Sequence, residues 1–479
     1  MGKILKSVSE IADRDQREVV IPDEYSVIGP RAFRGCASIQ RVVIPGTVTE
    51  IADSAFRGCK ALADVQIPNS VTTIGVRAFE GCVSLVSVMI PKSVTEIGDG
   101  AFDGCRRLEK IEAASGSRRY CGVDGALYSK NRTVLLCVPK TVRTFEIPAS
   151  VTKIAASAFS GCEALVKVTI PASITKIGYG LFYDCPCLET IEAASDSRWF
   201  HAFGGALYSK DRTVLLCVPK AVSAFEIPAS VTKIGDGAFG GCEALASVAI
   251  PKSVTEIGYG AFVGCKALRS IEIPKSVTKI GASAFEDCAA LVSMAIPKSV
   301  TEIEPWTFSG CEALKSVEIP KSVAALADGA FDGCKALKSI EIPETVTEIG
   351  WGVFRGCKAL KNIAIPKSIT VLPDRALSGC GSLANVTLPE SITKIGVGAF
   401  YHCKALAGVE IPGSVTEIGS WAFGGCGCLG SVSLGESLRE IQWNAFEDCV
   451  SLESISVPRS AQWRYGSFKD CPKLTVTRR

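Results

Sequence analysis

The chain has 479 residues, of which 47% are hydrophobic and 21% are charged, a composition that argues against a disordered segment. Its 52 basic and 49 acidic residues give a formal net charge of +3, whereas nucleic-acid-binding domains are usually strongly basic, so we expect no nucleic-acid partner. No apolar run approaches the roughly 20 residues that a membrane span requires.

Residues 1–19 predict an N-terminal cap. The segment is polar and compatible with a helix, and Lys3, Lys6 and Glu10 appear too early to leave the apolar stretch of a signal peptide. Lys6 also stands where a myristoylation motif beginning at Gly2 has Ser or Thr, so we expect no lipidation. A polar cap of this kind would cover the end of a repetitive core.

Residues 20–458 predict an array of repeats. A proline follows an aliphatic residue every 23 residues, with Gly435 once in its place and Pro458 as the last member. Two intervals are 57 residues long, and each contains a longer unit of 34 residues, at about 114–147 and 194–227. The chain is therefore expected to be one repeat array of 1–479, closed by a C-terminal cap at 459–479.

One repeat, residues 268–290, shows how the pattern would fold. Ile271 and Ile273 alternate with polar residues as in a half-buried strand, and Pro274 ends that strand because it cannot donate a ladder hydrogen bond. Gly281 permits a sharp bend before Phe285 returns to the core. A single repeat cannot bury its apolar face, so neighbours are predicted to stack with like residues above like, about 4.8 Å apart.

The cysteines form a column in this scheme. Seventeen of the 22 occupy the slot of Cys288, from Cys36 to Cys471. A zinc site needs cysteine pairs two to four residues apart, and stacked side chains that point the same way do not suit disulfide geometry. We therefore expect buried free thiols that pack in the core, which favours a reducing compartment.

The consensus Leu-x-x-Val-x-Ile-Pro-x-Ser-Val-Thr-x-Ile-Gly-x-x-Ala-Phe-x-Gly-Cys runs from about Val20 to Leu474 and resembles the BspA-type leucine-rich repeat. This resemblance implies a right-handed leucine-rich-repeat solenoid with a parallel β-sheet on the concave face. It also implies adhesion or protein recognition at a cell surface. The thiol column and the lack of a recognisable export signal favour an intracellular location instead, so localisation stays open.

Catalysis has little support in the sequence. His201 and His402 are the only histidines, and no phosphate-binding loop, nucleophile elbow or zinc-protease motif occurs. His402 precedes Cys403, but adjacent residues rarely face each other and Cys403 belongs to the cysteine column. We expect a protein that is not an enzyme and that needs no cofactor or metal.

Charged residues outside the repeat pattern form two columns between about residues 250 and 370. Both columns are basic, and Glu272, Glu318 and Glu341 run between them. One column contains Arg269, Lys315, Lys338 and Lys361, and the other, directly after the prolines, contains Lys252, Lys275, Lys298, Lys321 and Lys367. These charges are interpreted either as a striped patch that docks an extended partner or as solvated charges that keep a regular surface soluble.

Aromatic residues outside the core slots are the other candidate contacts. Trp199, Phe200 and Phe203 cluster in the second long unit, and Tyr120 takes the position of Phe200 in the first. Exposed aromatics anchor interfaces, although local packing over a turn is the alternative. We expect a scaffold that binds a protein or a host-surface macromolecule, and the alternative is a structural protein that associates with itself.

Overall fold

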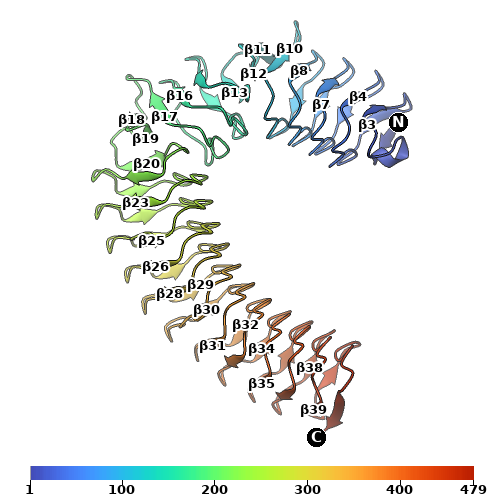
Figure 1. The fold of residues 1–479 in the computed structure, drawn as a ribbon, viewed down its shortest axis with the longest axis vertical. Coiled ribbons are helices and arrows are strands. Elements are labelled where there is room, and N and C mark those ends of the chain that lie inside the picture. Colours follow the sequence, from blue (N-terminus) through green and yellow to red (C-terminus); the bar gives the residue numbers. More distant parts are fainter. Residues whose placement is uncertain (1) are drawn as a thin grey trace. The chain divides into compact units, whose positions relative to one another are not determined.

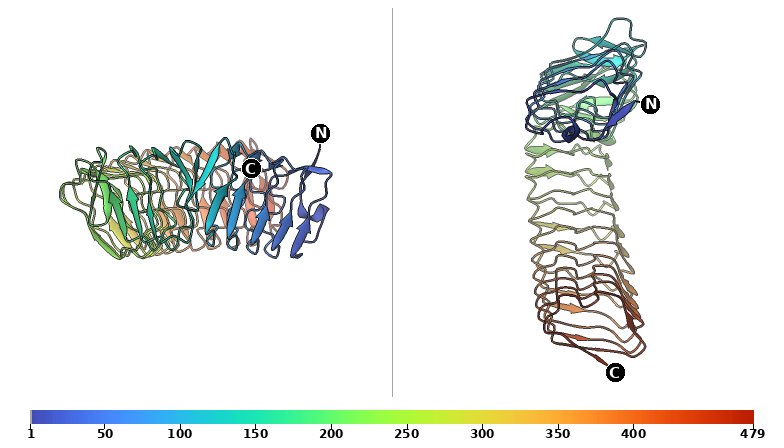
Figure 2. Two further views of the ribbon diagram at one scale, coloured as in Figure 1. Left: turned by 90° about the horizontal axis from the view of Figure 1, so that it is seen from above. Right: turned by 90° about the vertical axis from the view of Figure 1, so that its right-hand side faces the viewer.

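The computed structural model describes residues 2–479, and the chain divides into two compact units. The N-terminal unit comprises the residues up to Arg212 together with Leu216–Ala221, and the C-terminal unit comprises Thr213–Leu215 and Val222–Arg479. In each unit the chain winds as a solenoid whose strands recur about every 23 residues, and the turns stack as parallel rungs (Figures 1 and 2). The predicted repeat solenoid is confirmed.

The first ladder of strands comes from the Val-x-Ile segment that precedes each proline, and its pairings are parallel. In the N-terminal unit its strands are β2 (Glu18–Val20), β4 (Arg41–Val43), β6 (Asp64–Gln66), β8 (Ser87–Ile90), β10 (Lys110–Ala113), β14 (Thr144–Glu146), β16 (Lys167–Ile170) and β17 (Thr190–Ala193). In the C-terminal unit they are β21 (Ala224–Glu226), β23 (Ser247–Ala249), β26 (Ser293–Ala295), β28 (Ser316–Glu318), β31 (Asn362–Ala364), β33 (Asn385–Thr387), β35 (Gly408–Glu410), β37 (Ser431–Ser433), β39 (Ser454–Val457) and β41 (Thr475–Arg478).

The second ladder comes from the short extended segment that ends at the second isoleucine of each repeat, and it too is parallel. In the N-terminal unit its strands are β1 (Lys3–Leu5), β3 (Tyr25–Ile28), β5 (Glu50–Ile51), β7 (Thr73–Ile74), β9 (Glu96–Ile97), β13 (Val134–Cys137) and β15 (Lys153–Ile154). The others are β20 (Val214–Cys217), β22 (Lys233–Ile234), β24 (Glu256–Ile257), β25 (Lys279–Ile280), β27 (Glu302–Ile303), β29 (Ala325–Leu326), β30 (Glu348–Ile349), β32 (Val371–Leu372), β34 (Lys394–Ile395), β36 (Glu417–Ile418), β38 (Glu440–Ile441) and β40 (Gln462–Trp463).

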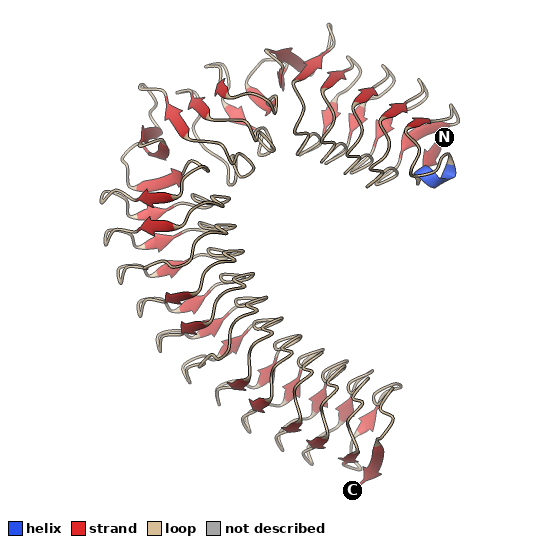
Figure 3. Cartoon of the chain, viewed as in Figure 1, coloured by secondary structure: helices blue, strands red, loops and turns tan. Residues whose placement is uncertain are grey.

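The third side of each turn is the Ala-Phe-x-Gly-Cys segment, drawn as loop in Figure 3. Its backbone also pairs between repeats, because the amide of Phe262 donates to the carbonyl oxygen of Ala284 at 2.8 Å. Within residues 2–479 the only helix is the 3₁₀-helix η1 (Val8–Glu10). Ser7 and Glu10 close it with a capping box, which satisfies backbone donors that a helix start leaves unpaired.

The core consists of side-chain columns. Phe262 and Phe285 stack with their ring centroids 5.3 Å apart and their planes 2° from parallel, and similar pairs recur along both units. Each pair of this kind contributes about 0.5–1.5 kcal/mol beyond its area burial. Identical residues at a fixed step therefore stabilise each interface between repeats in the same way.

The cysteine column is buried and hydrogen-bonded. Cys36 to Cys449 of the column are buried, Cys471 is half-buried, and each described cysteine is a free thiol. The Cys311 thiol donates to the carbonyl oxygen of Phe285 in the preceding repeat at 3.2 Å. Burial raises the pKa of both Cys380 and Cys426 to about 12. The predicted packing role of the column is confirmed.

Hydroxyl columns connect the rungs at the surface. Thr278 donates from Oγ1 to the carbonyl oxygen of Thr255 at 3.3 Å, and Ser276 donates to that of Val254 at 2.7 Å. The Thr and Ser columns thus add side-chain hydrogen bonds between repeats to the few backbone hydrogen bonds that the two-residue second strands make. Equivalent positions of adjacent repeats lie next to each other, and where they hold opposite charges the two side chains form an ion pair, as between Lys233 and Glu256 at 2.9 Å.

Each long unit contains an antiparallel hairpin that we did not predict. The hairpins pair β11 (Tyr120–Val123) with β12 (Ala126–Ser129), and β18 (Phe200–Phe203) with β19 (Ala206–Ser209). Their two-residue turns are Asp124-Gly125 and Gly204-Gly205, all four with positive φ between 50° and 76°. Such turns match the twist of the paired strands, and Asn-Gly, Asp-Gly and Gly-Gly are the residues that adopt them. The dipeptides were a readable signal for the hairpins.

Candidate recognition surfaces

The second hairpin presents aromatic side chains on one side of β18. Trp199 is 52% exposed and Phe203 is 54% exposed, with half-buried His201 between them in the sequence. Strand alternation places these three residues on the same side of the strand. The guanidinium of Arg212 lies 4.8 Å from the centroid of the Phe203 ring, a cation–π contact that orients both groups. Trp199, His201, Phe203 and Arg212 are called the hairpin surface below.

Two of the predicted aromatic contacts are not exposed, which corrects our interpretation of the cluster. Phe200 is only 5% exposed, because the same alternation that exposes its neighbours turns it into the core. Its amide donates to Oγ of Ser197 at 3.1 Å. Tyr120 is half-buried, and its hydroxyl donates to the carbonyl oxygen of Thr95 at 3.3 Å. Both residues belong to the first strand of their hairpin, and their contacts are made within the protein.

The first hairpin has the same backbone but a different surface. Arg119, Cys121 and Val123 occupy the positions of Trp199, His201 and Phe203. Their shared register, with Tyr120 opposite Ser129 and Phe200 opposite Ser209, shows that the aromatic side chains are not needed to form the hairpin. The aromatic residues of the second hairpin are therefore a feature of its surface, because the first hairpin forms the same backbone pairing without them.

A second surface is a column of three lysines, called the lysine column below. The amide of Lys338 donates to the carbonyl oxygen of Lys315 at 3.4 Å, and that of Lys361 donates to Lys338 at 3.2 Å. The three exposed side chains thus start from directly adjacent rungs. Within residues 2–479 no ion pair includes any of them. Like charges on opposed positions repel, so this column is a local concentration of positive charge.

The remaining charged candidates are exposed but less closely grouped. Glu318 and Glu341 end their first-ladder segments beside the lysine column, and Glu272 lies two rungs before Glu318. Arg269 is separated from Lys315 by the rung of Val292. The structure therefore brings together the three lysines and leaves Arg269 and Glu272 at the margin of the patch.

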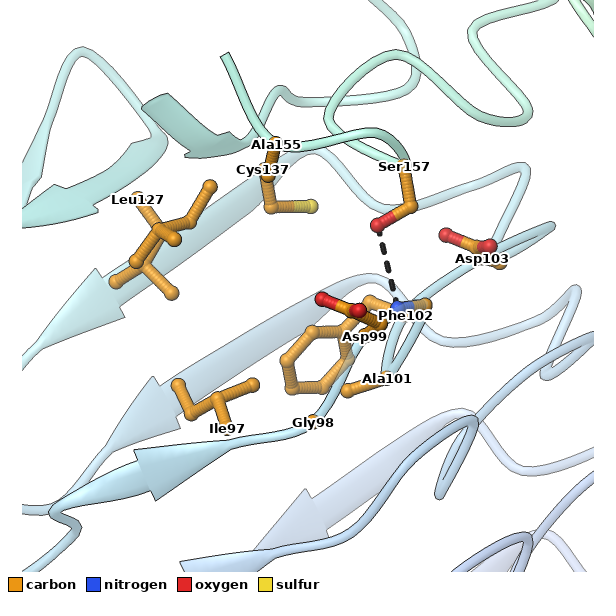
Figure 4. Close-up of a pocket in the computed structure, with 12 residues that line it drawn as sticks. Ile97, Gly98, Asp99, Ala101, Phe102, Asp103, Leu127, Cys137, Ala155 and Ser157 are labelled. Atoms are coloured by element: carbon orange, nitrogen blue, oxygen red, sulfur yellow. Dashed lines mark hydrogen bonds between the residues drawn. The ribbon is translucent and has the colours of Figure 1, made fainter. Parts of the chain in front are cut away.

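The N-terminal unit contains one small cavity of about 40 Å³, where β9 and the first long unit meet (Figure 4). Asp103, Cys137 and Ser157 line it, and the amide of Gly100 donates to the Ser157 hydroxyl at 3.2 Å. Burial raises the pKa of Asp103 to about 6, although the nearby ammonium of Lys140 opposes the rise. Small-molecule sites usually measure about 300–1,000 Å³, so this cavity has room for water only.

Buried lysines are the polar feature that the sequence did not reveal. Lys140 is 1% exposed and donates from Nζ to the carbonyl oxygen of Ala158 at 3.3 Å. Lys220, its counterpart in the second long unit, is 3% exposed, with Nζ 3.9 Å from Sγ of Cys217. The repeated Cys-Val-Pro-Lys segment was the available signal. The contacts of Lys140 are internal and support the turn that follows each hairpin.

The adjacent residues His402 and Cys403 point in different directions. The Cys403 thiol is buried and donates to the carbonyl oxygen of Leu377 at 3.2 Å, and burial raises its pKa. The His402 ring instead lies 4.0 Å from the ring of Tyr401. A protonated, buried thiol is a poor nucleophile, so these two residues do not form a reactive pair.

Among residues 2–479, no three or more His, Cys, Asp or Glu side chains gather so as to hold a metal ion. The same residues include no helix whose length and apolar character would allow it to cross a membrane.

The chain is similar to several solved structures. The chain is 29% identical to a leucine-rich repeat protein from Bacteroides ovatus, with a TM-score of 0.52 over 85% of this chain and 87% of that chain. A leucine-rich repeat protein from Eubacterium ventriosum is 24% identical, with a TM-score of 0.42 over 81% and 83% of the two chains. A leucine-rich cell surface protein from Faecalibacterium prausnitzii is 28% identical, with a TM-score of 0.36 over 77% and 78%.

No protein with a curated description matches the sequence significantly. The model of the BspA-type leucine-rich repeat region matches residues 12–120, 139–203, 219–336, 278–407 and 354–475. These matches cover most of the chain and coincide with the stacked turns of both units. The chain belongs to the BspA-type leucine-rich-repeat family.

Proposed function

We propose that this chain is a non-catalytic recognition scaffold that binds a protein, or another large surface-exposed molecule, through side chains outside its repeating core. The observation that carries this proposal is the hairpin surface. Trp199 and Phe203 are each more than half exposed on a hydrogen-bonded hairpin, although the equivalent positions of the first hairpin have no aromatic residue. Exposed Trp side chains are enriched at the energetic centres of interfaces.

The geometry supports binding better than catalysis. Burial raises the pKa of column thiols such as Cys403 and Cys426, the cavity beside Asp103 has room for water only, and the His402 ring lies against that of Tyr401. By contrast, both candidate surfaces start from hydrogen-bonded rungs, so the backbone positions of their side chains are fixed without a partner. Preorganised contacts of this kind lose little conformational entropy on binding.

The lysine column supplies a second contact in this proposal. Three ammonium groups on adjacent rungs would attract an acidic segment of the partner and accelerate its encounter. The contribution of such exposed charges falls as salt increases, because the Debye length is about 8 Å at physiological ionic strength. Anchoring by the hairpin surface should depend on salt much less.

A hairpin exchange tests the proposal. Trp199→Arg and Phe203→Val together give the second hairpin the residues of the first, Arg119 and Val123, which the same backbone already accommodates. Affinity capture from a lysate and the culture medium of the source organism, quantified by mass spectrometry, should recover a partner with the native chain and lose it with the double variant. Arg119→Trp with Val123→Phe is the matched control and should leave capture intact.

The proposal fails if every captured protein is retained equally by the native chain and by the double variant. Capture of the chain itself, with concentration-dependent association in analytical ultracentrifugation that the double variant abolishes, would favour the self-associating alternative. A circular dichroism spectrum equal to that of the native chain shows that the exchange has not disrupted the fold.

A further inference from the structure

We propose that two copies of this chain associate through the last rung of the C-terminal unit, in a two-fold symmetric dimer that pairs β41 of one copy with β41 of the other. The surface that would be covered is called the last-rung face and contains Trp463, Phe468, Cys471, Leu474 and Val476. It shares no residue with the hairpin surface or the lysine column, and it does not rest on the recognition function proposed above.

The last-rung face exposes side chains at positions that the preceding rung buries. Trp463 is 38% exposed, whereas Ile441, its neighbour on the preceding rung, is fully buried. Val476 is 37% exposed, whereas its neighbour Ile455 is 1% exposed. The ring of Phe468, the last of the phenylalanine column, is half-buried. The apolar core is therefore open to solvent at this rung, and covering it with another apolar surface is favourable.

The backbone of β41 also has groups without a partner strand. β41 is the last strand of its sheet, and the amide and carbonyl groups of successive residues point to opposite sides of a strand. The amides of Thr475 and Arg479 donate to the preceding rung at 2.9 and 3.2 Å. The groups of Val476 and Arg478 therefore point away from the sheet. An edge of this kind is a template for pairing with another strand.

The third side of the last turn is open in the same way. In the preceding repeat the amide of Phe446 donates to the carbonyl oxygen of Ser467 at 2.8 Å. The corresponding amide of Phe468 donates to no backbone carbonyl among residues 2–479. The last-rung face thus has both apolar side chains and backbone donors that the earlier rungs satisfy with the next repeat.

The first turns of the N-terminal unit are covered instead. Val8 of η1 is buried, and its amide donates to the carbonyl oxygen of Ala32 at 2.9 Å. Leu5, Val19 and Phe33, at core positions of these turns, are each at most 2% exposed. Head-to-tail association needs two different open surfaces and leads to rings or filaments, whereas one open surface that is complementary to itself gives a closed two-fold dimer. The closed first turns therefore favour the dimer.

An antiparallel pair of β41 strands has the required two-fold symmetry. A pairing centred on Thr477 places Val476 of one copy opposite Arg478 of the other. The outward amides and carbonyls of both residues then form hydrogen bonds across the interface, because directly opposed residues of this type exchange both bonds. The sheets of the two copies continue as one, with the apolar side chains of the two last rungs on the same side of it.

A second copy covers this face more completely than a peptide would. An extended peptide could add to β41 by strand addition, but it would cover one side of the turn and leave Trp463 and Phe468 exposed. Another last rung has the same three sides. The Arg478 guanidinium lies 4.0 Å from the centroid of the Trp463 ring and donates to the carbonyl oxygen of Pro458 at 3.1 Å, so its charge is held beside the interface.

Sedimentation velocity of the full chain, over a range of micromolar concentrations, should show an equilibrium between monomer and dimer. Val476→Lys places an ammonium opposite the Arg478 guanidinium of the other copy, twice in each dimer, and should weaken dimerisation by roughly tenfold or more. Val476→Glu places a carboxylate there and should dimerise more tightly than the lysine variant, also by roughly tenfold or more. A general loss of stability would weaken both variants equally.

An engineered disulfide tests the register. The Thr477→Cys variant places two thiols across the symmetry axis in a non-hydrogen-bonded pair, whose Cα atoms lie about 4.5 Å apart, within the range of a disulfide. Mild oxidation should link this variant into a dimer on a non-reducing gel, whereas the Thr475→Cys variant should stay unlinked. The native chain, with exposed Cys187 and Cys428, measures the background of other disulfides.

Val20→Lys is the matched control for the added charge, because Val20 is 62% exposed on β2, an edge strand of the N-terminal unit. It should dimerise as the native chain does, and so should Trp199→Arg with Phe203→Val, so the dimer and the recognition function can fail separately. The proposal is overturned if the native chain stays monomeric, if Val476→Lys and Val476→Glu dimerise equally, or if the Thr477→Cys variant is not linked.

Discussion

The thiol of Cys288 donates a hydrogen bond to the carbonyl oxygen of Phe262 in the preceding repeat, 3.2 Å away. The same contact recurs along the column, for example at Cys59 and Cys471, with Leu377 in place of phenylalanine at Cys403, whereas the Cys162 thiol donates to the carbonyl oxygen of Pro139 at 3.8 Å. The cysteine column therefore fills a small space in the core and adds a second hydrogen bond to a carbonyl that already accepts one, since the amide of Cys265 also donates to the carbonyl oxygen of Phe262 at 3.1 Å. Its function is to join consecutive repeats.

Removing one such thiol should weaken one interface between repeats. Cys288→Ala loses the thiol hydrogen bond to Phe262, while the carbonyl oxygen of Phe262 still accepts the Cys265 amide, so we expect a loss of about 0.5–1.5 kcal/mol in the free energy of unfolding. Urea denaturation measures the change. Cys428→Ala is the control, because Cys428 is exposed and lies outside the column, and it should change stability by less than about 0.5 kcal/mol.

Alkaline pH should destabilise the whole array. Burial raises the pKa values of Cys380 and Cys426 to about 12, above the value of about 8.5 of an unfolded thiol. Between these values the unfolded chain releases protons that the native chain retains, so stability falls as pH rises. It should be constant below about pH 8.5 and decrease above it by up to about 1.4 kcal/mol per pH unit for each such thiol.

Thermal unfolding at a series of pH values between neutral and about 10.5 measures this effect. A melting temperature that stays constant across the range would show that the thiols ionise equally in both states. Replacing Cys380 and Cys426 with alanine should reduce the alkaline slope, and replacing exposed Cys187 and Cys428 should leave it unchanged.

Replacing a buried residue of the second hairpin should lower stability much more than replacing an exposed one. Phe200→Ala removes a side chain that is 5% exposed, so we expect a loss of about 3–5 kcal/mol. Trp199→Ala changes a mostly exposed side chain and should cost less than about 1 kcal/mol. Thermal melts of the two variants compare them directly, and equal losses would show that Trp199 also belongs to the core.

The lysine column should be unfavourable when no partner is bound. Lys338 lies between two lysines on adjacent rungs, and two unit charges about 5 Å apart in water repel by roughly 0.8 kcal/mol. Lys338→Gln should therefore raise stability by about 0.5–1 kcal/mol at low salt, with little effect at high salt. Lys335→Gln, which removes an ion pair with Glu312, should not raise it, and a gain in both variants would indicate a general effect of charge.

The sequence predicted the features that repeat. The proline spacing predicted the rungs, the alternation around Ile271 predicted the first ladder, and the Cys288 slot predicted a buried thiol column. Each of these predictions depends on a periodic pattern, and the pattern is easy to recognise because the repeat occurs many times along the chain. The charge alternation at Lys233 and Glu256 was readable for the same reason.

Features that occur once or twice were harder to predict. Burial of Phe200 depends on which side of β18 faces the core, and the hairpin fixes that side. The hairpin itself was not predicted, although its Gly-Gly turn is a known signal for one. Lys140 is buried because the chain folds over it after the hairpin, and the only sequence signal of its burial was a Cys-Val-Pro-Lys segment that occurs twice. The positive φ of Trp421 follows from the position of a turn, and it is visible only in three dimensions.

Footprinting of the chain bound to its captured protein tests the recognition proposal most directly. Carbene labelling of the free and bound chain, read by mass spectrometry, reports the exposure of each aromatic side chain. We predict that Trp199 and Phe203 lose labelling in the complex while Tyr465, which is 83% exposed, is labelled equally in both. Unchanged labelling of Trp199 and Phe203 in a complex that still forms would contradict the account.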